Sequence, residues 1–332
     1  MKRVNKSSDR VLFIDIARGI SILLMIAGHV LTNGIKRNII FSFHMPLFII
    51  ASGYFHKDRS FKEEIKTLFL KLLLPTTIIV FAVFMISNVP KIGFEKSIVE
   101  VLKVITVCWS HKSKIDYSFA SVDVLWFIYL LIGIRLLFSI NKKVSKDNDI
   151  LLSVIIIIET LIGYIVGIKG YWLPWSIDIS FACMLFYFIG YILKKYNVLE
   201  KILSNYKILL PILLIWVVGI KYSWIEIAVR SYPHGLWSYI TAISGSIIIL
   251  KLSQYIEKIK YISNALAWCG KNSLYILFGH HIERGLIVYN LSIANASLLK
   301  AALISIKSAF SMLFAIIYSY IMKALKHIGG KK

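Results

Sequence analysis

The chain has few acidic residues and few charged residues of any kind. Its 332 residues include 17 Asp and Glu against 39 Lys and Arg, and charged residues make up only 17% of the sequence. Soluble domains carry about 25% charged residues. A chain with 58% hydrophobic residues and a mean hydropathy of +0.74 therefore cannot cover a surface that faces water. These figures exclude disordered, collagen-like and disulfide-scaffold proteins and predict an integral membrane protein.

Cysteine and proline are also scarce. The 3 cysteines, Cys108, Cys183 and Cys269, stand far apart and form no pair with the spacing of metal ligands. Neither a disulfide framework nor a metal site is expected from them. Since no Pro- or Gly-rich linker divides the chain, we expect one membrane domain over 1–332. Its helical core covers about 10–323, and the tails 1–9 and 324–332 are expected to be cytoplasmic.

Long apolar runs dominate the rest of the sequence. A helix that crosses a bilayer needs about 20 predominantly apolar residues. The sequence therefore predicts an all-α, polytopic membrane protein with about ten transmembrane helices. The expected spans are 11–32, 39–56, 68–89, 121–140, 150–168, 177–193, 208–222, 236–256, 264–289 and 299–322.

The excess of positive charge, +22 at pH 7, would suggest nucleic-acid binding in a soluble protein. Here its distribution is more informative. If the N-terminus is cytoplasmic, 23 of the 39 basic residues fall in the inner segments and 10 in the outer ones. Because basic residues concentrate in cytoplasmic loops, this predicts that both termini lie inside a multi-pass protein of the cell membrane. Nucleic acid is not expected as a partner.

The first span carries three ionisable residues, Asp15, Arg18 and His29. Such groups are costly in the hydrocarbon region and suggest function. Eleven steps of about 100° return almost to the same helix face, so His29 is expected above Arg18 at a rise of about 16 Å. Asp15 lies one turn below Arg18 and can pair with it. Arg18 alone could instead be an anchor that reaches the inner interface.

Other polar residues are expected at the outer level of the membrane. His44, Asp178 and His280 each lie in the outer half of a different predicted span. Any one of them could be an interface anchor or part of a hydrogen bond between helices, but their common depth with His29 favours a polar pocket open to the outside. Glu283 and Arg284, near an outer helix end, are weaker candidates.

Four motifs follow one another along the chain. They are IDIARGISILLMIAGH at 14–29, FSFHMPLFIIASGYF at 41–55, VLWFIYLLIG at 124–133 and CGKNSLYILFGHHI at 269–282. Their order and spacing resemble the acyltransferase 3 family of integral-membrane O-acyltransferases, in its sugar O-acetylating branch. The resemblance covers nearly the whole chain. One departure is the loop after the second motif, where Lys57, Asp58 and Arg59 replace the Arg-x-x-Arg of the family.

The resemblance implies transfer of an acyl group, usually acetyl from acetyl-CoA, to a hydroxyl group of a surface glycan or its precursor. A guanidinium in the inner half suits the phosphates of such a donor. An imidazole near the outer boundary can serve as general base or as nucleophile. The expected site residues are Arg18, Asp15 and Arg59 for the donor, His29 as base or nucleophile, and His44, Asp178 and His280 beside it.

Two other functions stay open at this point. Ten helices around a polar pocket could form a transporter or flippase for a lipid-linked sugar or a small anion, although the two halves of the chain show no inverted repeat. The chain could also be a sensory or scaffold domain that keeps the membrane fold of the family without its activity, but the intact Arg18 and His29 argue against this.

Overall fold

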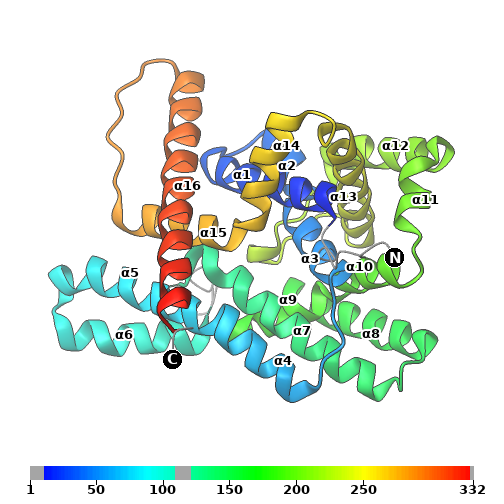
Figure 1. The fold of residues 1–332 in the computed structure, drawn as a ribbon, viewed down its shortest axis with the longest axis horizontal. Coiled ribbons are helices and arrows are strands. Elements are labelled where there is room, and N and C mark those ends of the chain that lie inside the picture. The colour runs from blue at the N-terminus through cyan, green and yellow to red at the C-terminus, as the bar shows by residue number, and fades with distance from the viewer. Residues whose placement is uncertain (1–10, 109–120, 330–332) are drawn as a thin grey trace.

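The computed structural model describes residues 11–108 and 121–329 (Figure 1). Within these ranges the regular elements are helices, apart from one isolated bridge between Glu226 and Ser231. This confirms the all-helical class. The predicted tail 1–9 lies outside the described residues. The α-helices are α1 Leu12–Val30, α2 Ile35–Phe41, α3 His44–Tyr54, α4 Phe61–Leu68, α5 Leu74–Ile92, α6 Phe94–Val107, α7 Trp126–Val144, α8 Asp149–Ile168, α9 Ile177–Ala182, α10 Met184–Lys195, α11 Leu199–Ser204, α12 Tyr206–Tyr222, α13 Leu236–Ile256, α14 Lys260–Lys271, α15 Ser273–Leu286 and α16 Ala296–Gly329.

Several helices are long and apolar enough to cross a membrane. Among the described residues there are 6, or up to 7 if the bent pair Pro174–Ala182 and Met184–Lys195 counts as one span. The predicted spans 39–56 and 264–289 are each broken into two helices, and α12 has only 17 residues. The protein is thus a multi-pass membrane protein, while the count of ten spans and the orientation stay predictions.

The helices differ in how much of their surface is buried by the rest of the protein. In the most apolar 18-residue stretch of each helix, the share that is buried by the rest of the protein is 67% for α1, against 28% for α8 and 11% for α16. The exposed side chains of α8 and α16 are mainly isoleucine and leucine. Since lipid tails are as apolar as these side chains, the poorly buried helices present a surface suited to lipid. Those around α1 form the protein interior.

Two glycines hold α1 against α14. A Cβ atom on Gly19 would lie 1.9 Å from the carbonyl oxygen of Leu266, and one on Gly270 would lie 1.8 Å from that of Asp15. Only glycine allows backbones to approach this closely. Helix α14 ends at Lys271, and Asn272, whose backbone has φ −104° and ψ 17°, separates it from α15, which begins with Ser273. This break places the first turn of α15 beside the middle of α1.

The predicted second span is interrupted just before His44. The backbone of Phe43 has φ −148° and ψ −27°, which is not helical, and separates α2 from α3. Pro46 follows in the first turn of α3, where its missing N–H breaks no intrahelical hydrogen bond. The interruption puts His44 at the start of α3, with its ring nitrogen Nδ1 2.7 Å from the carbonyl oxygen of Ile40.

Candidate active site

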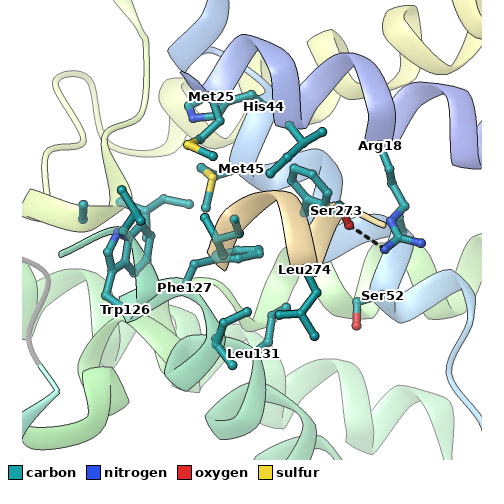
Figure 2. A pocket seen from close by; sticks show the side chains of 18 of the residues that line it. Arg18, Met25, His44, Met45, Ser52, Trp126, Phe127, Leu131, Ser273 and Leu274 are labelled. Carbon is teal, nitrogen blue, oxygen red and sulfur yellow. Dashed lines mark hydrogen bonds between the residues drawn. The ribbon is translucent and has the colours of Figure 1, made fainter. Parts of the chain in front are cut away.

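A cavity of about 560 Å³ lies between α1, α3, α7 and α15 (Figure 2). Helix α1 contributes Arg18 and His29 at opposite ends of it, and α3 contributes Ser52 and His44. The end with Arg18 is called the guanidinium end here, and the end with His29 the imidazole end. Figure 2 shows Arg18, Ser52 and Ser273 together on one side, with apolar side chains between them and His44. The apolar middle is lined by Ile22, Met25, Met45, Phe48, Phe127, Leu131, Leu274 and Leu277.

Arg18 is fixed by two partners at the guanidinium end. Its Nη2 donates to the hydroxyl oxygen of Ser273 at 3.0 Å, and its Nη1 lies 3.5 Å from a carboxylate oxygen of Asp15. The pairing of Asp15 with Arg18 is the one expected from their spacing. Ser273 was not expected, because it comes close only through the break between α14 and α15. The side chain of Arg18 stays 29% exposed and lines the cavity.

Two further guanidinium groups share one carboxylate at the same end. Arg59 donates from Nη1 to Glu64 at 2.9 Å, and Arg135 donates from Nε to the other oxygen of Glu64 at 2.7 Å. Glu64 is buried in α4, which begins with a capping box between Ser60 and Glu63. Both arginines line the cavity. The sequence predicts Arg59 as a donor-binding residue, but it does not indicate Arg135, which is a lone arginine within an apolar span.

His29 is an exposed side chain that projects into the cavity at the imidazole end. Its ring centroid is 5.4 Å from that of His280, with 38° between the ring planes. His280 is fully buried, and its Nδ1 lies 3.1 Å from Oε2 of Glu283, which is also fully buried. Lys307 of α16 donates to the other oxygen of Glu283. The structure thus places the predicted His280 beside His29, although His280 itself is not part of the cavity wall.

His44 lines the cavity at the same end. A carbonyl oxygen only accepts hydrogen bonds, so the contact with Ile40 requires the proton on Nδ1 and leaves Nε2 of the neutral ring as an acceptor. The ring packs edge-on against Phe41, with centroids 5.0 Å apart. His29 and His44 therefore lie at one end of this cavity, and His280 packs against His29 from outside the cavity wall.

Asp178 does not join them. It is almost fully buried and accepts from Nε and Nη2 of Arg230 at 2.7 and 3.1 Å. The guanidinium of Arg230 also lies 4.0 Å from the ring centre of Trp172. This pair holds the segment before α13, whose residue Glu226 lines the cavity mouth and accepts from Arg37 at 2.8 Å. Sequence depth alone could not show that Asp178 faces Arg230 and not the cavity.

Asp123 is a cavity residue that the sequence analysis did not find. Its backbone has φ +47°, and its carboxylate accepts from Nε and Nη2 of Arg284 at 2.7 and 3.0 Å. His281 Nδ1 lies 3.9 Å from the same carboxylate. Arg284, only a weak candidate from the sequence, therefore fixes the carboxylate of Asp123, which lies in the cavity wall just before α7. Within the described residues no group of three His, Cys, Asp or Glu side chains is arranged to hold a metal ion.

A comparison with models of protein families gives a match. Residues 11–324 match the acyltransferase 3 family, which is described as an acyltransferase domain. The matched range includes every residue discussed above for the cavity. A comparison with curated proteins found no match. The family match supports an enzyme over the transporter and scaffold alternatives.

Proposed function

The chain belongs to the acyltransferase 3 family and is a membrane acyltransferase, and from that premise we propose that it transfers acetyl from acetyl-CoA to a hydroxyl group of a surface glycan or its precursor. The observation that carries this proposal is the cavity that joins the guanidinium end to the imidazole end. An acyl-CoA has the matching form, with phosphates at one end of a thin arm and a thioester at the other.

The guanidinium end suits the phosphates of the donor. Arg18, Arg59 and Arg135 all line it, and the last two share the single carboxylate of Glu64, so the group keeps an excess of positive charge. Guanidinium groups bind phosphate through paired, charge-assisted hydrogen bonds. Asp15 orients Arg18 for this contact. From Arg18 to His29 the rise along α1 is about 16 Å, which is comparable to the length of a pantetheine arm.

At the imidazole end, His29 acts as general base. Its ring nitrogen takes the proton of the acceptor hydroxyl while the hydroxyl oxygen attacks the carbonyl carbon of the thioester. The tetrahedral intermediate then collapses, the carbon–sulfur bond breaks, and the coenzyme A thiolate receives the proton. His280 packs against His29 and His44 lines the same end, so both are placed to orient the base or to hold the acceptor. A second route, in which His29 carries the acyl group itself, uses the same residues.

The proposed orientation explains why one cavity has two unlike ends. With ten spans and both termini inside, the guanidinium end faces the cytoplasm, where acyl-CoA is made, and the imidazole end faces the outside. The bias of basic residues toward the inner segments supports this orientation. Acyl transfer would then occur across the cell membrane. Residues of about 10–323 would form the membrane domain, and the N-terminal and C-terminal tails would both lie in the cytoplasm.

Isotope transfer tests the proposal. Membranes that contain the protein are incubated with acetyl-CoA labelled in the acetyl group, and glycan is then isolated and treated with mild base, which releases O-acetyl esters. We expect base-labile label in glycan only when the protein is present. If label stays in the thioester, or enters glycan equally in membranes without the protein, the proposed reaction is wrong. Mass spectrometry of the labelled glycan identifies the acceptor.

A further inference from the structure

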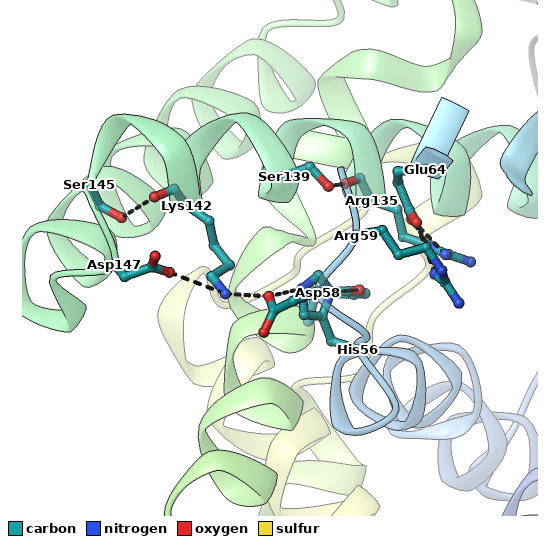
Figure 3. Close-up of polar contacts among 10 residues, drawn as sticks. His56, Asp58, Arg59, Glu64, Arg135, Ser139, Lys142, Ser145 and Asp147 are labelled. Carbon is teal, nitrogen blue, oxygen red and sulfur yellow. Dashed lines mark hydrogen bonds and ion pairs between the residues drawn. The ribbon is translucent and has the colours of Figure 1, made fainter. Parts of the chain in front are cut away.

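A second cavity, of about 650 Å³, adjoins the guanidinium end of the first. His56 and Arg59 belong to the walls of both cavities. The remaining wall comes from the last turns of α7 and α10, the turn after α7 and the start of α4. Figure 3 shows Lys142 reaching from α7 toward Asp58, with Arg59 and Arg135 farther along the same helix side. The two cavities thus form consecutive compartments that meet at His56 and Arg59.

Positive charge prevails in the wall of this second cavity. Its cations are Arg59, Lys142, Lys143 and Lys195, and its carboxylates are Asp58 and Asp147. Lysines in the last turn of a helix also compensate the helix dipole, and inner loops are rich in lysine in any membrane protein. Those ordinary reasons explain why lysines occur here. They do not explain why lysines from two helices line one hollow that continues the active-site cavity. Lys195 is held there by Asp149, whose two carboxylate oxygens each accept from its ammonium group at 2.7 Å.

Lys142 is already held in position. Its ammonium group contacts Asp58 and lies 3.2 Å from a carboxylate oxygen of Asp147. The hydrogen bond from Lys142 lowers the pKa of Asp58, so Asp58 is ionised at neutral pH. Both contacts fix the lysine at the wall, but the two carboxylates also oppose an entering anion. Removing one of them should therefore improve anion binding.

Two aromatic rings complete the wall, Phe61 and Tyr191. The ammonium groups of Lys142 and Lys195 lie 5.4 and 5.6 Å from the ring centre of Tyr191, and that of Lys143 lies 5.9 Å from the centre of Phe61. A nucleotide offers phosphates to the ammonium groups and a flat base to the rings, and base–aromatic stacking is a common mode of nucleotide recognition. Inorganic phosphate would use only the lysines.

We propose that the second cavity binds the 3′-phosphoadenosine end of the acyl-CoA donor, with Lys142 and Lys195 contacting its 3′-phosphate, while the diphosphate stays at Arg18, Arg59 and Arg135. The inference rests on the proposed function and extends it. The first cavity is about as long as the acyl-bearing arm, so the nucleotide must lie beyond Arg18 and Arg59. The second cavity occupies that place.

Binding of coenzyme A to the purified full chain in zwitterionic detergent tests the inference. We expect Lys142→Ala and Lys195→Ala each to raise the Kd for coenzyme A about ten-fold. This is the effect of losing one charge-assisted hydrogen bond. Dephospho-coenzyme A, which lacks the 3′-phosphate, should bind the wild type more weakly than coenzyme A does and should lose less affinity in the variants. Lys194→Ala is the matched control, because Lys194 is exposed on the same turn of α10 but lines neither cavity.

Asp58→Asn should tighten coenzyme A binding two- to three-fold, by about 0.5 kcal/mol. Because a misfolded protein would not bind more tightly, this variant separates a local charge effect from misfolding. The inference is overturned if both lysine variants bind coenzyme A and dephospho-coenzyme A as the wild type does. It is also overturned if these variants bind anionic lipid vesicles more weakly than the wild type does but bind coenzyme A equally well. That result would make the cavity a site for lipid headgroups. If the wild type does not bind coenzyme A at all, the proposed function fails as well.

Discussion

The guanidinium end and the imidazole end of the first cavity differ in how their charges are stabilised. Arg18, Arg59 and Arg135 have side chains that are 29%, 28% and 21% exposed, and each is paired with a carboxylate. At the other end, His280 and Glu283 are fully buried. Within the described part of the chain, neither ring nitrogen of His280 makes a well-aligned hydrogen bond.

The difference separates binding from chemistry. Permanent charges that remain partly hydrated can hold an anionic donor without a large desolvation cost. The imidazole of His29 projects exposed into the cavity and, unlike a guanidinium, can accept and return a proton during a reaction. The two ends should therefore respond differently to mutation, and each of the following predictions tests that separation.

The largest effect is expected at the imidazole end. His29→Ala should lower kcat by about 10²–10⁴-fold, the usual contribution of a general base, and should leave the Kd for coenzyme A unchanged. Steady-state kinetics and calorimetric binding of the same preparation measure both quantities. His234→Ala serves as the control, because His234 is exposed and lies outside both cavities. Loss of donor binding in His29→Ala would contradict the separation of the two ends.

Asp178 tests how far the imidazole end extends. Because Asp178 and Arg230 form a buried pair, Asp178→Ala should destabilise the protein by about 3–5 kcal/mol, as a buried partner left alone does. A thermal-shift assay in detergent measures this. The double variant Asp178→Leu, Arg230→Met should recover much of the stability and keep measurable kcat. If Asp178→Ala has a normal melting temperature but a greatly reduced kcat, Asp178 takes part in the reaction and is not only a structural residue.

Asp178 and Arg135 also show what sequence reasoning could reach. Periodicity along one helix placed Arg18 and His29 on one face, and both do line the cavity. Depth in the membrane predicts that His44, His280 and Asp178 lie at one level but gives no rotation about the helix axis, and in the structure Asp178 faces Arg230 and not the cavity. Arg135 and Ser273 became visible only through contacts across helices, and the broken α14–α15 pair has no clear sequence signal.

At the guanidinium end the expected effect falls on donor binding. Arg18→Ala removes charge-assisted hydrogen bonds of about 1.5–3 kcal/mol, so the KM for acetyl-CoA should rise about 10–100-fold with little change in kcat. Arg135→Ala should act in the same direction. Lys36→Ala, at an exposed basic residue in the first turn of α2 that lines neither cavity, provides the control. If either arginine variant lowers kcat at saturating donor and keeps KM, that arginine acts at the reacting centre.

The smallest effect is expected at the junction of the two cavities. Tyr187 contacts Nδ1 of His56 at 2.9 Å, and Nε2 of His56 lies 3.3 Å from a carboxylate oxygen of Asp58. Both ring nitrogens therefore have partners within the protein, and neither is needed by the donor. Donor affinity between about pH 6 and pH 8 should then be the same in His56→Gln and in the wild type. If affinity in the wild type rises as the pH falls through 6.5, and His56→Gln loses that rise, His56 is a fourth cation for the donor and the guanidinium end is not limited to permanent charges.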